Sequence, residues 1–169
     1  FMPVFDWTRS NLDYKLEDGS TALVYYKSEI EKMDPRNGDL NLPGWDASYK
    51  KDELNAVLEK YKSVSEEDLW NNLKYFLEQI IPVAEEVKIK MAIHPDDPPW
   101  PIFGLPRIIT NEENLDRFLK LYESEYNGLT LCTGSLGVSK DNNMPNMIRR
   151  FGKKIHFAHL RNVKIINDG

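Results

Sequence analysis

Apolar residues recur at helical spacing through the middle of the chain. The i, i+3, i+4, i+7 pattern of one buried helix face is carried by Leu54, Val57, Leu58 and Tyr61. Ser65 then opens the segment SEED, which is typical of an N-cap followed by acidic residues in a first helical turn. A second apolar stripe follows it and consists of Leu69, Leu73, Phe76, Leu77 and Ile80. The pattern therefore predicts two successive helices.

Four apolar segments have the composition of strands: FMPVF (1–5), VKIKMAI (87–93), LTLC (129–132) and KIHFAHLRNV (154–163). Helical patterns separate the last three. One helix is capped by Asn111 and stopped by Gly128, and the other has Pro145 near its start and Gly152 after its end. Strands that alternate with helices indicate an α/β fold with a parallel sheet.

The whole chain, residues 1–169, is predicted to form a single domain with an irregular excursion at about residues 11–48. Within that excursion, ALVYY (22–26) fits either a strand or one helical turn, and DPRNGDLNLPGWD (34–46) is rich in turn residues. The chain begins inside an apolar segment and stops at the turn-like INDG (166–169), which predicts that it is a piece of a longer polypeptide.

Composition narrows the possible partners. The net charge is -5 without any block of Lys or Arg, so nucleic acid is not expected as a partner. Apolar stretches stay well short of the roughly 20 residues of a membrane span, so no membrane partner is expected either. The one cysteine, Cys132, excludes an intrachain disulfide and favours a reducing, cytoplasmic location.

Chemically useful side chains follow each predicted strand. They are Asp6, Trp7 and Arg9; His94, Asp96 and Asp97; Cys132 and Ser135; and His159, Arg161 and Asn162. Ligands bind at the carboxyl ends of parallel strands, and neighbouring strands lie only about 4.8 Å apart. A histidine, a cysteine and a histidine at three successive strand ends therefore predict a site for zinc, iron or manganese.

Each of these residues also fits a structural role. Cys132 alone fits a small buried hydrophobic residue. His94 fits a loop histidine bonded to the backbone, and Asp96 and Asp97 fit turn caps. His156 is separated from His159 by an odd number of positions, so the two would face opposite sides of a regular strand.

Longer segments resemble the mannonate dehydratase family of hexuronate catabolism. They are FMPVFDWTR, IHPDDPPWPIFGLPRI, NEENLDRF, LTLCTGSLG and HFAHLRNVK, in this order along nearly the whole chain. The resemblance implies part of a TIM (β/α)8 barrel, about strands 4 to 7 with their helices. It also implies a divalent metal, Mn²⁺ or Fe²⁺, and dehydration of D-mannonate to 2-keto-3-deoxy-D-gluconate.

By the same resemblance, His94, Cys132 and His159 are metal ligands, while the fourth ligand, an aspartate, and the catalytic residues are expected beyond Gly169. The expected positioning group is Asp96 or Asp97, which would orient His94 through its second nitrogen. The expected substrate-binding residues are Arg161, Arg9, Trp7, Asn162 and Trp100.

Two other hypotheses stay open at this point. One is a xylose-isomerase-like sugar isomerase or epimerase, although a cysteine ligand argues against it. The other is an inactive truncated fragment. A partial barrel also exposes sheet edges and apolar area, so a homo-oligomer is expected.

Overall fold

The computed structural model describes residues 9–34 and 51–166, which fall into two compact units. The first unit contains residues 1–63, 102–105 and 165–169, and the second contains residues 64–101 and 106–164. The predicted strand at 1–5, together with Asp6 and Trp7, lies outside the described residues. The division into two units does not test the prediction that residues 1–169 form a single domain, which stays a prediction.

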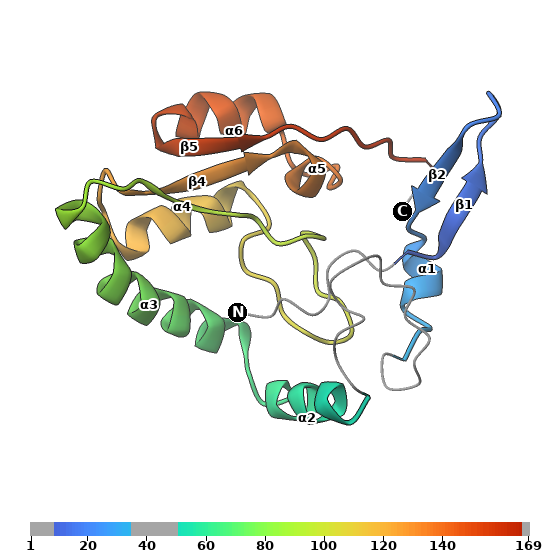
Figure 1. The fold of residues 1–169 in the computed structure, drawn as a ribbon, viewed down its shortest axis with the longest axis horizontal. Helices are drawn as coiled ribbons and strands as arrows, with labels where there is room; N and C mark the ends of the chain where they lie inside the picture. The colour runs from blue at the N-terminus through green and yellow to red at the C-terminus, as the bar shows by residue number, and fades with distance from the viewer. Residues whose placement is uncertain (1–8, 35–50, 167–169) are drawn as a thin grey trace. The chain divides into compact units, whose positions relative to one another are not determined.

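In the described part of the first unit, β1 (Asn11–Lys15) and β2 (Thr21–Val24) form an antiparallel hairpin, so the ALVYY segment supplies a strand. A short helix α1 (Lys27–Ile30) and the helix α2 (Lys51–Tyr61) follow in this unit (Figure 1). Its small core consists of Ile30, Leu58, Ile102 and Leu105. The predicted excursion at 11–48 thus contains regular structure up to Ile30, and residues 35–48 lie outside the described part.

The second unit confirms the predicted α/β class. Its sheet has the order β3 (Met91–Ile93), β4 (Asn127–Cys132) and β5 (Ile155–His159), and both neighbouring pairs are parallel (Figure 1). The connections contain α4 (Glu112–Leu121) after β3, and α5 (Thr133–Leu136), α6 (Met144–Phe151) and the 3₁₀ turn η3 (Gly152–Lys154) after β4. The part of a TIM barrel predicted from the sequence is confirmed as far as these three strands extend.

Long helix α3 (Glu66–Glu86) precedes the sheet and begins at the predicted residue. The Ser65 hydroxyl accepts the Asp68 N–H, and the Asp68 carboxylate accepts the Ser65 N–H, which completes a capping box. Helix α3 packs with α4, α6 and β4 around one apolar core, whose fully buried members include Trp70, Ile81 and Phe118. None of the described helices is long and apolar enough to span a bilayer.

The predicted strand at 87–93 is too long, because its first half closes helix α3. The Ile89 N–H donates to the Ala84 carbonyl and the Lys88 N–H to the Glu85 carbonyl, which is the Schellman pattern of a helix end. Lys88 has φ of 57°, the left-handed conformation that glycine usually supplies at this position. The alternation of VKIK therefore belongs to a helix end, and only Met91–Ile93 pairs in the sheet.

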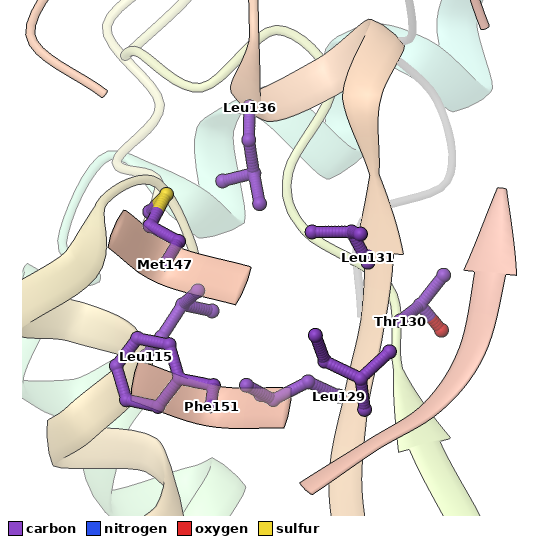
Figure 2. A pocket seen from close by; sticks show the side chains of 8 residues that line it. Leu115, Leu129, Thr130, Leu131, Leu136, Met147 and Phe151 are labelled. Carbon is purple, nitrogen blue, oxygen red and sulfur yellow. The ribbon is translucent and has the colours of Figure 1, made fainter. Parts of the chain in front are cut away.

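A small apolar cavity lies between β4 and the helices that cover it. Figure 2 shows its lining, which includes Leu115, Leu129, Met147 and Phe151. Its volume of about 10 Å³ leaves room for at most one water molecule. The cavity is therefore a packing void.

Candidate metal centre

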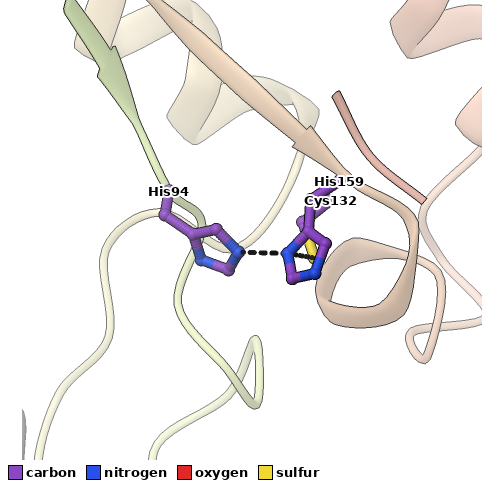
Figure 3. A group of neighbouring side chains, drawn as sticks. All are labelled: His94, Cys132 and His159. Carbon is purple, nitrogen blue, oxygen red and sulfur yellow. Dashed lines mark hydrogen bonds between the residues drawn. The ribbon is translucent and has the colours of Figure 1, made fainter. Parts of the chain in front are cut away.

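Three potential metal ligands meet at the carboxyl end of the sheet. His94 directly follows β3, Cys132 ends β4 and His159 ends β5. Cys132 is paired with His159 in the register of β4 and β5, so their side chains leave the sheet side by side. Figure 3 shows the His94 ring turned toward His159, with the Cys132 sulfur next to it.

The donor atoms are spaced as one metal ion requires. His94 Nε2 lies 3.4 Å from His159 Nδ1, which lies 3.6 Å from Cys132 Sγ. All three atoms lie within 4.8 Å of one another. Tetrahedral bonds of about 2.05 Å to nitrogen and about 2.3 Å to sulfur would separate two nitrogens by about 3.4 Å and a nitrogen from sulfur by about 3.6 Å. The residues therefore fit a first-row divalent ion.

His94 is oriented by the backbone. Its Nδ1 lies 2.7 Å from the Pro95 carbonyl oxygen, so Nδ1 carries the proton and donates it there. This tautomer leaves the lone pair of Nε2 free to bind a metal. We expected Asp96 or Asp97 to accept this proton. The Pro95 carbonyl accepts it instead, and both carboxylates have other partners.

Asp96 instead ties the loop after β3 to the segment before α4. Its Oδ2 accepts the N–H groups of Ile108 at 2.9 Å and Ile109 at 2.8 Å, and its Oδ1 lies 3.3 Å from Arg107 Nη1. The Asp96 N–H also donates to the Ile109 carbonyl. These partners lie 11–13 positions away, so Asp96 is not the local turn cap considered from the sequence; it fixes the loop that carries His94.

Asp97 contacts the centre through Arg161. Its Oδ2 accepts a hydrogen bond from Arg161 Nη2, the same nitrogen that lies 2.8 Å from Ser135 Oγ and 3.4 Å from Cys132 Sγ. Burial works to lower the pKa of Arg161, but the hydrogen bond and charge of Asp97, aided by Cys132, outweigh it and raise that pKa. The guanidinium therefore stays charged beside the sulfur.

The His156 side chain does not lie on the face of the sheet opposite His159, as a regular strand would predict. A register shift separates the pairs Leu129–Ile155 and Thr130–Phe157, so β5 carries one extra residue at His156. The His156 ring fills the space beside Gly128, four positions before Cys132 on β4, and its Nδ1 donates to the Met91 carbonyl. Both histidines therefore lie on the same side of the sheet.

The predicted substrate-binding residues are only partly placed. Arg161 lies beside Cys132, and Asn162 follows it as an exposed residue beyond β5. Trp100 lies in the loop after His94 and is partly buried. Arg9 belongs to the first unit and Trp7 lies outside the described residues, so neither is placed at this centre. Substrate binding by these residues stays a prediction.

Two contributors were given no role from the sequence. Ser135, which was noted only as a polar residue after its strand, is fully buried, and its hydroxyl donates to Cys132 Sγ at 3.2 Å. The signal was its position three residues after the cysteine, one helical turn along α5. The Pro95 carbonyl that orients His94 is a backbone group, for which the sequence holds no signal.

Comparison with known proteins places the chain among the mannonate dehydratases. The family model described as D-mannonate dehydratase (UxuA) matches residues 1–169. Mannonate dehydratase 2 of Halalkalibacterium halodurans is 61% identical over 97% of this chain, and the mannonate dehydratase of Oceanobacillus iheyensis is 53% identical over 99%. In both comparisons the chain spans 48% of the relative's length.

A solved structure agrees with these sequence matches. The crystal structure of mannonate dehydratase from Streptococcus suis serotype2 superposes with a TM-score of 0.80 at 49% identity, covering 96% of this chain and 43% of the other. The resemblance inferred from the sequence motifs is confirmed, and the chain belongs to the D-mannonate dehydratase (UxuA) family.

Proposed function

We propose that the full-length protein dehydrates D-mannonate to 2-keto-3-deoxy-D-gluconate with a divalent ion, Mn²⁺ or Fe²⁺, bound by His94, Cys132 and His159. The observation that carries the proposal is the meeting of these three donors at 3.4 and 3.6 Å on successive strand ends. Relatives that are 53–61% identical are named mannonate dehydratases, which supports the choice of reaction.

The reaction removes a proton from C2 and a hydroxyl group from C3, which leave as water, and the resulting enol becomes the 2-keto acid. A divalent ion would supply Lewis acidity next to the sugar-acid oxygens. His94 contributes a fixed Nε2 lone pair, because its Nδ1–H is bonded to Pro95. His159 contributes Nδ1, and Cys132 contributes a buried sulfur. We assign no described residue as the base that takes the C2 proton.

Substrate contacts are proposed for residues at the rim of the same centre. Asn162, exposed beyond the end of β5, offers amide hydrogen bonds to sugar hydroxyls. Trp100, in the loop after His94, offers an apolar wall. We also propose that Arg161, Arg9 and Trp7 contact the substrate in the full-length protein.

The other hypotheses have less support. A sugar isomerase or epimerase of the xylose-isomerase type has carboxylate and histidine ligands, whereas the buried Cys132 belongs to the donor group here.

A cytoplasmic location is proposed because a reducing compartment keeps the Cys132 thiol free to bind a metal. A homo-oligomer is proposed for the full-length protein, to be read from sizing chromatography coupled to light scattering.

The test is metal-dependent turnover of D-mannonate by the full-length protein. We expect a 2-keto-3-deoxy product, loss of activity after chelation and recovery on adding Mn²⁺ or Fe²⁺. Cys132→Ser should bind less metal, because a hydroxyl does not replace a thiolate for such an ion. An isomerised sugar acid as the only product, or full turnover by a protein freed of metal, would refute the proposal.

A further inference from the structure

A hydrogen-bond network approaches the Cys132 sulfur independently of the two histidines. Ser135 Oγ donates to Sγ at 3.2 Å, and Arg161 Nη2 lies 3.4 Å from the same sulfur. Nη2 carries two hydrogens: one goes to the Asp97 carboxylate, and the other is shared between Ser135 Oγ, 2.8 Å away, and the sulfur. The sulfur thus receives one hydroxyl and one guanidinium donor, and the guanidinium is held in turn by a carboxylate.

The sulfur end of the network is shielded from water. Cys132 and Ser135 are both fully buried, and the Asp97 side chain is 11% exposed, while the Arg161 side chain is 34% exposed. Hydrogen bonds to a charged group are stronger than neutral ones, and a low local dielectric strengthens them further. The donors therefore act on the sulfur where their electrostatic effect is large.

Backbone features hold Arg161 in this position. The Thr133 hydroxyl donates to the Arg161 carbonyl at 2.7 Å and accepts the Arg161 N–H at 2.9 Å, which fastens the chain beyond β5 to the start of α5. A Cβ atom at Gly134 would overlap the Arg161 side chain. The glycine leaves the space that the guanidinium occupies, so the local structure is built around this arginine.

We propose that Arg161, anchored by Asp97, acts with Ser135 as a positioning residue for the Cys132 ligand, fixing the sulfur toward His94 and His159 and drawing electron density from it by hydrogen bonding. This inference rests on the proposed metal site, because the effect needs a bound ion to be read out. It gives the arginine a role toward the sulfur, where the sequence predicted one toward the substrate.

Hydrogen bonds to a ligating sulfur change the metal's properties. They stabilise the sulfur lone pairs, and such outer partners commonly alter metal affinity by roughly 10–100-fold. With Co²⁺ as a probe, stabilised lone pairs place the sulfur-to-cobalt charge-transfer band at higher energy. Removing a donor should therefore move this near-ultraviolet band to longer wavelength.

The experiment loads the full-length protein with Co²⁺ and records that band in the wild type, Arg161→Met, Arg161→Lys and Ser135→Ala. We expect Arg161→Met to shift the band to longer wavelength and to weaken Co²⁺ binding roughly 10–100-fold. Ser135→Ala should shift it in the same direction, and Arg161→Lys should partly restore the wild-type position. Arg149→Met, which alters an exposed arginine on α6, serves as the matched control and should leave the band unchanged.

The outcomes separate this inference from the proposed function. A wild-type protein that binds Co²⁺ without a sulfur band would overturn both, because Cys132 would not be a ligand. A wild-type band that keeps its position in Arg161→Met and Ser135→Ala would overturn the positioning role alone. Weaker Co²⁺ binding by these variants, with the sulfur-to-cobalt band of the loaded protein unmoved, would also overturn the positioning role. A merely structural defect lowers the fraction of protein that holds Co²⁺ but does not change the bound sulfur.

Discussion

The loop that presents His94 should depend on a single carboxylate, that of Asp96. Its Oδ2 accepts two backbone N–H groups, from Ile108 and Ile109, whose residues are only 8% and 3% exposed. Replacing Asp96 by alanine leaves both donors without their acceptor and leaves Arg107, 9% exposed at its side chain, without its carboxylate. Each lost charge-assisted bond costs roughly 1.5–3 kcal/mol.

Water offsets part of this cost, because the Asp96 side chain is 23% exposed. We therefore expect Asp96→Ala to lower the free energy of unfolding by about 3 kcal/mol, toward the lower end of the sum of two bonds. Asp96→Asn should cost less, about 1–2 kcal/mol, because a carbonyl oxygen in the place of Oδ2 still accepts both N–H groups, while these bonds lose their charge assistance and the ion pair with Arg107 is lost.

Two measurements on the full-length protein check this reasoning. Urea unfolding gives the free energies, with Asp141→Ala as the control at an exposed aspartate. Amide hydrogen exchange reports on Ile108 and Ile109, whose protection should fall in Asp96→Ala and persist in Asp96→Asn. Unchanged protection of these two amides in Asp96→Ala would refute the assignment, whatever the global stability.

Three further changes should have distinct effects. Lys88→Gly should raise the free energy of unfolding by roughly 0.5–1 kcal/mol in a denaturant titration, since φ of 57° strains a residue with a Cβ atom; a loss of stability would contradict the helix-end assignment. Gly128→Ala should destabilise by roughly 1–3 kcal/mol and lower the melting temperature, because the added Cβ would overlap the His156 ring. The side-chain hydrogen bond from Ser65 lowers the pKa of Asp68 in the folded protein. The Asp68 carboxylate therefore stabilises the fold above its unfolded pKa of about 3.9, and this contribution is lost as pH falls through its folded pKa. Asp68→Asn should accordingly flatten the acid limb of a stability-against-pH profile.

Local signals predicted most of the second unit. Ser65 and Asn111 begin helices as predicted, because a capping side chain bonds to backbone only three residues away. The meeting of His94, Cys132 and His159 followed from the rule that side chains gather at the carboxyl ends of parallel strands. These features need only short-range information and the order of strands and helices.

The features that the sequence did not predict depend on contacts between distant residues. The groups that donate to Asp96 lie 11–13 positions away, and the one that donates to Asp97 lies 64 positions away. No local pattern distinguishes these donors from His94 as the partner of the carboxylates. Lys88 occupies a position that usually signals itself by glycine, so the end of α3 was read as the start of a strand. In both cases the packing of the fold decides between local alternatives of similar energy.

The bulge at His156 connects the sheet to the chemistry of the centre. Leu129 pairs with Ile155, so regular pairing from there would bring Ala158 opposite Cys132. The extra residue shifts the register by one, and His159 takes that place instead. Since a one-residue shift changes which side chains share a face of a sheet, the proposed ligand set depends on this irregularity. His156 stabilises it by bonding to the Met91 carbonyl across β4, over a residue without a side chain, Gly128. In our proposal His156 binds no metal, but the bulge that it stabilises is what brings His159 to the position of a ligand.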